Sequence, residues 1–199
     1  MNEGYIKFNC NLIEKKPLPK EELVDLLKWR QKLFFLGLIG AYPNGIGFGN
    51  ISKRYNQNKF IITGSATGNL EELSEEHFVL VIEHDFEKNF LSCEGKINAS
   101  SESLSHAAIY DSTNVNAVMH VHNKKLWDYL MRELPFTSKE IEYGTPEMAN
   151  AIKKVIANPM ISKEKIFAMG GHEEGVICFG ENLGEAGERL LKWFGKIKS

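Results

Sequence analysis

Apolar and polar positions recur along the chain with two different periods, which predicts both helices and strands. Apolar residues three or four positions apart are typical of amphipathic helices. Five segments are predicted as helices: residues 19–40, 100–112, 124–134, 145–158 and 182–197. Pro19 and Gly40 mark the ends of the first, and such residues are common at helix boundaries.

Local signals also indicate how two of these helices begin. Ser100 or Ser101 is placed to cap the helix of residues 100–112, because a serine hydroxyl can accept from the first free backbone N–H groups. Thr145 followed by Pro146 opens the helix of residues 145–158, since proline fits the first helical turn.

Shorter apolar runs bounded by turn residues predict strands. They lie within residues 5–13, 59–63, 77–97, 115–122, 165–171 and 175–180, and the third segment reads as two strands joined by a turn at residues 87–89. Residues 41–50, AYPNGIGFGN, read as a glycine-rich loop. Because several strands look like hairpin neighbours, we predict an α/β fold with a largely antiparallel central sheet covered by helices.

Length and charge narrow the class of protein. The 199 residues suffice for a full hydrophobic core, and no linker or repeat divides them, so we expect a single domain, residues 1–199. With 24 basic and 26 acidic residues the net charge is −2. This balance lacks the basic footprint of a nucleic-acid-binding protein, so we expect no nucleic-acid partner. A net charge close to zero is still compatible with a local anion site.

Cysteine usage and hydropathy indicate the compartment. The three cysteines, Cys10, Cys93 and Cys178, are widely spaced and odd in number, which favours reduced thiols. No signal-peptide pattern opens the sequence, and the longest apolar run, residues 33–42, is too short for a membrane span. We therefore expect a cytoplasmic protein without a membrane partner.

Two histidines lie one residue apart in the predicted strand NAVMHVH. Strand side chains alternate between faces, so His120 and His122 project to the same side, close enough to hold one metal ion. The alternative is two histidines tolerated at the edge of a core. His172, on a predicted turn between two strands, is a candidate third ligand, although alone it reads as a loop histidine. Three histidines would leave a coordination position open, as in catalytic zinc sites.

A carboxylate and several polar groups could complete the site. Glu102 lies at the start of a predicted helix, where an acidic side chain also complements the helix dipole. The same helix start, with Ser100 and Ser101, is a suitable anion site. Asn50 and the stretch from Thr63 through Gly64 to Ser65 could add further donors, which suits a phosphate.

In this order the segments resemble the class II aldolase/adducin head-domain family. The matching pieces are GNIS (49–52), ITGS (62–65), SSESLSHAAIY (100–110), NAVMHVH (116–122), YGTPEMA (143–149) and the stretch from His172 through GVICFG. Each motif is weak alone, and the six together in order carry the resemblance.

The resemblance implies an α/β/α three-layer domain with a mostly antiparallel sheet, assembled as a homotetramer. It implies a divalent metal, typically Zn²⁺, held by His120, His122 and His172, with Glu102 as acid/base. The residues matching Asn50, Thr63, Gly64, Ser100 and Ser101 would hold the phosphate of a sugar-phosphate substrate. The activity would be a carbon–carbon lyase reaction in which the metal polarises a carbonyl and stabilises an enediolate.

The chain departs from the family pattern at several positions. Ala66 stands where the phosphate loop commonly has glycine, and Ala99 replaces a frequent proline. Glu173 and Glu174 follow His172 where glycine is usual, which adds negative charge near the site. No tyrosine proton donor can be matched: Tyr129 lies in a predicted helix, and Tyr143 belongs to the next motif.

Two alternative functions stay open at this point. A methylthioribulose-1-phosphate dehydratase uses similar chemistry, with a metal-polarised carbonyl and a glutamate. A non-catalytic, adducin-like scaffold domain would keep the fold without the chemistry. The presence of His120, His122, His172 and Glu102 together favours an enzyme, because a scaffold has no need for all four.

Overall fold

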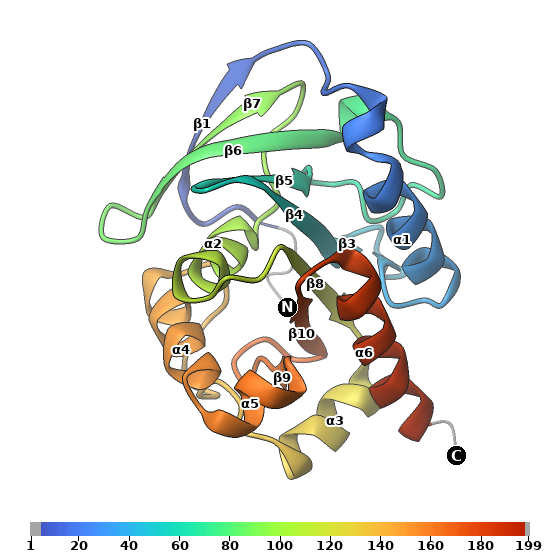
Figure 1. The fold of residues 1–199 in the computed structure, drawn as a ribbon, viewed down its shortest axis with the longest axis vertical. Helices are drawn as coiled ribbons and strands as arrows, with labels where there is room; N and C mark the ends of the chain where they lie inside the picture. The colour runs from blue at the N-terminus through green and yellow to red at the C-terminus, as the bar shows by residue number, and fades with distance from the viewer. Residues whose placement is uncertain (1–4, 198–199) are drawn as a thin grey trace.

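The computed structural model describes residues 5–197, and its centre is one sheet of eight strands (Figure 1). Across the sheet the order is β1-β7-β6-β5-β4-β8-β10-β9. The strands are β1 Asn9–Glu14, β4 Asn50–Asn56, β5 Lys59–Thr63, β6 Phe78–Asp85, β7 Phe90–Gly95, β8 Ala117–His122, β9 Ile166–Ala168 and β10 Gly175–Gly180. Only the β1–β7 pair is parallel within the described part of the sheet, which confirms the predicted mostly antiparallel arrangement.

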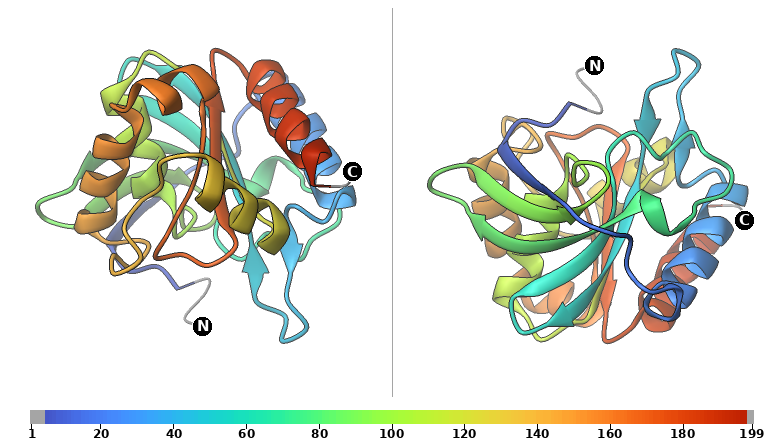
Figure 2. Two further views of the ribbon diagram at one scale, coloured as in Figure 1. Left: turned by 90° about the horizontal axis from the view of Figure 1, so that it is seen from below. Right: turned by 90° about the horizontal axis from the view of Figure 1, so that it is seen from above.

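Helices cover both faces of this sheet, as expected for a three-layer α/β/α fold. They are α1 Val24–Phe35, α2 Ser103–Ser112, α3 Lys124–Glu133, α4 Pro146–Ile156, α5 Pro159–Glu164 and α6 Leu183–Lys196, with short 3₁₀ turns η1 Lys20–Glu22 and η2 Glu75–His77. Helices α1 and α6 lie together on one face, and α2 and α4 lie on the other (Figures 1 and 2).

Strand β8 lies in the interior of the sheet, between β4 and β10. All six of its residues are buried, because helices pack against both of its faces. This explains its nearly continuous apolar sequence, which is typical of strands covered on both sides. The two histidines of β8 are therefore in the protein interior, where an uncompensated polar group is costly.

Several predicted helix boundaries follow from local capping. Thr145 accepts from the N–H of Met148 and precedes Pro146, so α4 begins where the sequence predicts. Asn123 and Asn182 cap α3 and α6 in the same way. The α2 prediction was wrong in detail: Glu102 occupies the N-cap position without a side-chain cap, and Ser100 and Ser101 precede it in a turn.

The structure differs from the sequence prediction in three further elements. Helix α1 ends at Phe35 rather than Gly40, because Gly37 takes a left-handed φ of 68° and the N–H of Leu38 donates to the C=O of Leu33 (2.9 Å). The predicted loop 41–50 lies largely within a small ribbon of β2 Gly40–Ala41 and β3 Gly47–Phe48. The six-residue α5 was not predicted.

Strand β4 was also missed, and its composition explains why. Its sequence NISKRYN lacks apolar alternation, yet it occupies a central place between β5 and β8. Asn50 and Ser52 are buried polar residues on the α2 side, where Ser52 Oγ hydrogen-bonds to His106 Nδ1 (2.7 Å). The strand is polar because polar partners meet it there.

Among residues 5–197, no helix combines the length and the apolar character that crossing a membrane requires.

Candidate functional site

The histidine pair of β8 forms the base of the site. His120 and His122 are 1% and 2% exposed, and their Nε2 atoms lie 3.0 Å apart. The period of the strand places both rings on one face. Because Asn50 of β4 is the direct cross-strand partner of His120, its side chain emerges on that face too.

His172 joins the pair from the turn between β9 and β10. The turn closes through hydrogen bonds from His172 N–H to Met169 C=O (3.2 Å) and from Gly175 N–H to His172 C=O (2.9 Å). The ring centroid of His172 lies 5.0 Å from that of His120 and 4.7 Å from that of His122. Gly175 makes room for this meeting, since a Cβ there would come within 3.1 Å of both His120 Cε1 and His172 Cγ.

The three rings form a donor set that fits a divalent metal ion. One nitrogen atom of each of His120, His122 and His172 lies within 4.8 Å of the others, and all three side chains are buried. Burial, and then the neighbouring histidines, hold the pKa of His120 well below its usual range. Burial and His172 do the same for His122. Neutral imidazoles are the form that binds metal.

Glu102 lies beside this group from the start of α2. Its carboxylate is 1% exposed, and Oε1 lies 3.8 Å from His172 Nδ1. Ser105 Oγ donates to Oε2 at 2.7 Å, which holds the carboxylate in place. The structure therefore brings the four residues of the sequence hypothesis together in one buried cluster.

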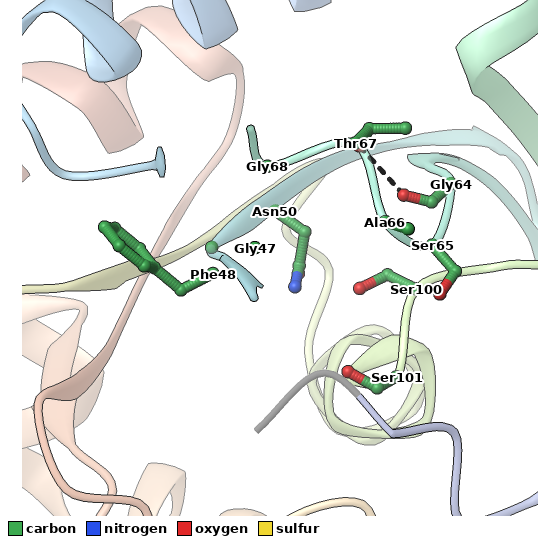
Figure 3. A pocket seen from close by; sticks show the side chains of 11 residues that line it. Gly47, Phe48, Asn50, Gly64, Ser65, Ala66, Thr67, Gly68, Ser100 and Ser101 are labelled. Atoms are coloured by element: carbon green, nitrogen blue, oxygen red, sulfur yellow. Dashed lines mark hydrogen bonds between the residues drawn. The ribbon is translucent and has the colours of Figure 1, made fainter. Parts of the chain in front are cut away.

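A polar cleft adjoins the cluster (Figure 3). Asn50, Ser65, Ser100 and Ser101 contribute polar side chains to it. It continues the histidine site, because Asn50 pairs with His120 across the sheet and Ser101 precedes Glu102. The full lining is Gly47, Phe48, Gly49, Asn50, Gly64, Ser65, Ala66, Thr67, Gly68, Ser100 and Ser101.

Three residues of the predicted anion site have other local partners. Thr63 is buried beside the cleft rather than lining it, and its Oγ1 accepts from Ile51 N–H at 3.3 Å. The Gly64 and Ser65 amides donate within the fold, to His77 C=O and Asn98 C=O (both 2.8 Å). Side chains therefore supply much of the polar character of the cleft.

The sequence also matches a known family. The model of the Class II Aldolase and Adducin N-terminal domain matches residues 43–192. The chain belongs to this family. A comparison with curated protein sequences returns no match.

Solved structures of the family share the fold. An L-fuculose-1-phosphate aldolase from Thermus thermophilus is 20% identical, with a TM-score of 0.66 over 90% of this chain and 92% of that one. A second L-fuculose 1-phosphate aldolase is 20% identical, with a TM-score of 0.69 over 92% and 85%. A sugar-phosphate aldolase from Thermotoga maritima is 15% identical, with a TM-score of 0.66 over 90% and 93%.

Two of the departures from the family pattern share a backbone feature in this structure. Ala66 has a φ of 59° and Glu174 a φ of 69°, in the left-handed region that glycine adopts at little cost. Ala66 lines the cleft, and Glu174 lies in the turn that carries His172. Both turns therefore hold a left-handed residue that carries a side chain.

The tyrosines named from the sequence have distinct positions. Tyr143 is buried and stacks on His172, with ring centroids 4.3 Å apart and an interplanar angle of 21°. Tyr129 packs near Trp193, with ring centroids 6.1 Å apart. Tyr42, which the sequence analysis missed, contacts His122 Nδ1 through its hydroxyl at 2.8 Å. No short-range signal in the sequence connects residues 42 and 122.

A second missed residue supports the cleft from within the core. Arg30 of α1 is 2% exposed and donates to the backbone carbonyls of Glu71 (2.7 Å), Thr67 (2.9 Å) and Gly68 (3.2 Å). Burial lowers the pKa of Arg30 to about 10, so the guanidinium stays charged at neutral pH. One cation thus holds the loop that lines one side of the cleft.

Proposed function

We propose that this protein is a metal-dependent lyase that cleaves a carbon–carbon bond of a sugar phosphate. The observation that carries the proposal is the buried group of His120, His122 and His172 beside Glu102. The names of the structural relatives, two L-fuculose-phosphate aldolases and a sugar-phosphate aldolase, support the substrate class.

The residues of the cluster have different roles in the proposed reaction. His120, His122 and His172 would hold a divalent ion, which would supply Lewis-acid polarisation of the substrate carbonyl. Glu102 carries a proton to or from the carbon next to that carbonyl, with Oε1 on the histidine side. Ser105 orients the carboxylate through its hydrogen bond to Oε2.

The polar cleft is the proposed phosphate site. Hydroxyls of Ser100 and Ser101 and the side-chain amide of Asn50 bind the phosphate oxygens, with Gly64 allowing the loop to pack closely. A Cβ at Gly64 would clash with the side chain of Ile97. Thr63 belongs to this site through its support of β4 at Ile51.

Further properties belong to the same proposal. We expect Zn²⁺ as the metal, since three imidazoles with an open position are a common catalytic zinc arrangement. We expect one domain over residues 1–199, a cytoplasmic location and a homotetramer. Light scattering on the purified protein measures its subunit number.

The first experiment measures the metal content of purified protein and of a His120→Ala, His122→Ala double variant. We expect about one divalent ion per chain in the wild type and almost none in the variant, because two of three ligands are gone. An unfolding curve for each protein checks that both are folded. If the wild type holds no metal even after zinc is added back, the lyase mechanism is excluded and the adducin-like scaffold function takes its place.

The second experiment identifies the reaction. Metal-loaded protein is incubated with a panel of ketose 1-phosphates, and dihydroxyacetone phosphate and aldehyde are measured. Formation of both products in equal amounts supports aldol cleavage. Loss of water from methylthioribulose 1-phosphate, with no cleavage of any ketose phosphate, would instead establish the dehydratase alternative.

A further inference from the structure

His122 is connected to a carboxylate through a tyrosine. The Tyr42 hydroxyl lies 2.8 Å from His122 Nδ1 and donates to Glu174 Oε2 at 3.0 Å. The three side chains come from the β2–β3 ribbon, from β8 and from the turn that carries His172. Both Tyr42 and Glu174 are half-buried, so these contacts are partly shielded from water.

The hydrogens available on the Tyr42 hydroxyl and the Glu174 carboxylate decide which group donates in each of the two hydrogen bonds. A phenol has one hydrogen, and an ionised carboxylate can only accept. When the Tyr42 hydrogen goes to Glu174, the Tyr42 oxygen must accept from His122, so the imidazole hydrogen is on Nδ1. The His122 Nε2 atom, 3.0 Å from His120 Nε2, then presents a lone pair to the histidine group.

The backbone conformation at Glu174 is unusual for a residue other than glycine. A φ of 69° is strained for a residue with a Cβ, and such strain is concentrated at functional sites. The Glu174 C=O accepts from Asn123 N–H at 3.0 Å, which anchors the turn to the end of β8. Glu173 differs: its side chain is 53% exposed, with Lys124 3.8 Å away.

Tyr42 is itself held by the ribbon. Its N–H donates to Ile46 C=O at 2.9 Å, and its ring centroid lies 4.8 Å from that of Phe48. Phe48 also stacks on His122, with centroids 5.3 Å apart and an interplanar angle of 28°. The ribbon therefore limits both the rotation of the His122 ring and the position of the hydroxyl that it contacts.

We propose that Tyr42 and Glu174 are positioning residues that hold His122 in the Nδ1–H tautomer and so aim Nε2 at a bound divalent metal. This inference rests on the proposed metal centre. It also gives a role to Glu174, one of the two extra acidic residues after His172: its carboxylate accepts the hydrogen bond donated by the Tyr42 hydroxyl, which orients His122. Partners of this kind around metal-ligating histidines typically change metal affinity 10–100-fold when they are removed.

The test measures metal affinity by titration of Zn²⁺ or Co²⁺ against a competing chelator. Tyr42→Phe removes only the hydroxyl, and we expect its affinity to fall roughly 10–100-fold. Glu174→Gly removes the carboxylate and relieves the strained φ, so we expect weaker metal binding without a lower unfolding midpoint in chelator. Glu174→Gln keeps an acceptor oxygen, so its metal affinity should be closer to that of the wild type than the affinity of Glu174→Gly is.

Matched controls separate this role from general effects of mutation. Glu173→Gln removes an equal charge one residue away, and Tyr55→Phe removes an exposed hydroxyl on β4. Both should bind metal as the wild type does. Equal affinity of the wild type, Tyr42→Phe and Glu174→Gly would overturn the proposal, as would an equal loss in Glu173→Gln.

A spectroscopic measurement on metal-free protein reports the tautomer directly. Nitrogen-15 NMR should show His122 protonated at Nδ1 in the wild type and as a mixture of tautomers in Tyr42→Phe. Protonation at Nε2 in the wild type would overturn the inference. Because this experiment needs no metal, it decides the positioning role even if the wild type fails to bind metal and the proposed function falls.

Discussion

The histidine group and the polar cleft adjoin each other, yet the chain builds them differently. The group draws two of its three ligands from one strand, where the period alone sets their common direction. The cleft is lined by serines, an asparagine and glycines from separate segments. Arg30 holds one of these segments through hydrogen bonds to the carbonyls of Thr67, Gly68 and Glu71. The first site depends on the identity of a few side chains, and the second depends on the placement of loops.

The largest effect should come from the residue that lies where the two regions meet. Glu102→Gln keeps the size of the side chain and an acceptor for Ser105 but removes the acid/base group. We expect kcat for sugar-phosphate cleavage to fall roughly 10²–10⁴-fold, in the range for lost general acid–base catalysis. Metal content should stay near the wild-type value, and unchanged kcat would exclude Glu102 as the proton carrier.

Arg30→Met tests whether the cleft depends on its support. The change leaves three carbonyls without their cation, and we expect the free energy of unfolding to drop by about 2–4 kcal/mol. Affinity for inorganic phosphate should fall as well, whereas metal content should not. Chemical denaturation and phosphate titration measure the two effects. Equal losses of metal and phosphate binding in Arg30→Met would show that the histidine group and the polar cleft depend on the same support.

The third prediction concerns His106, a buried histidine that lies near the histidine group without belonging to it. Burial lowers its pKa to about 3, against an ordinary value near 6.5. Between these values the unfolded chain binds a proton that the folded protein does not, so stability falls as the pH drops below about 6.5. For this residue the loss at pH 5 is about 2 kcal/mol.

The measurement compares urea unfolding of wild type and His106→Gln at pH 7 and pH 5, both in chelator. Glutamine can keep the hydrogen bond with Ser52 Oγ but does not titrate. The variant should therefore lose about 2 kcal/mol less than the wild type over this interval. Equal losses in the two proteins would show that His106 is accessible to protons when folded.

The smallest effect concerns a single hydroxyl of the cleft. Ser101→Ala should raise KM for a sugar phosphate roughly tenfold, the value of one hydrogen bond to a charged group of about 1.5 kcal/mol. An unphosphorylated ketose should be affected little. Ser112→Ala, at the far end of α2, is the matched control. A similar rise in KM for both sugars would place Ser101 at the carbonyl end of the substrate instead.

Much of the fold follows from local pattern. The strand of His120 and His122, the turn between β6 and β7 and the capped start of α4 all lie where period and capping predict them. The failures have physical reasons. Strand β4 is polar because its inward side chains meet polar partners, and α1 stops early because Gly37 takes a left-handed φ.

The sequence by itself determined that His120 and His122 share one face, because the two-residue period of a strand is a local property. Only the tertiary structure decided that His172, Glu102 and Asn50 meet them. That meeting depends on β8 pairing with β4 and β10, and on α2 packing across the same face. It also decided the contacts of Tyr42 and Arg30, which lie 80 and 37 positions from His122 and Thr67. Residues so far apart in the sequence are brought together by tertiary packing, and no local sequence pattern predicts such contacts.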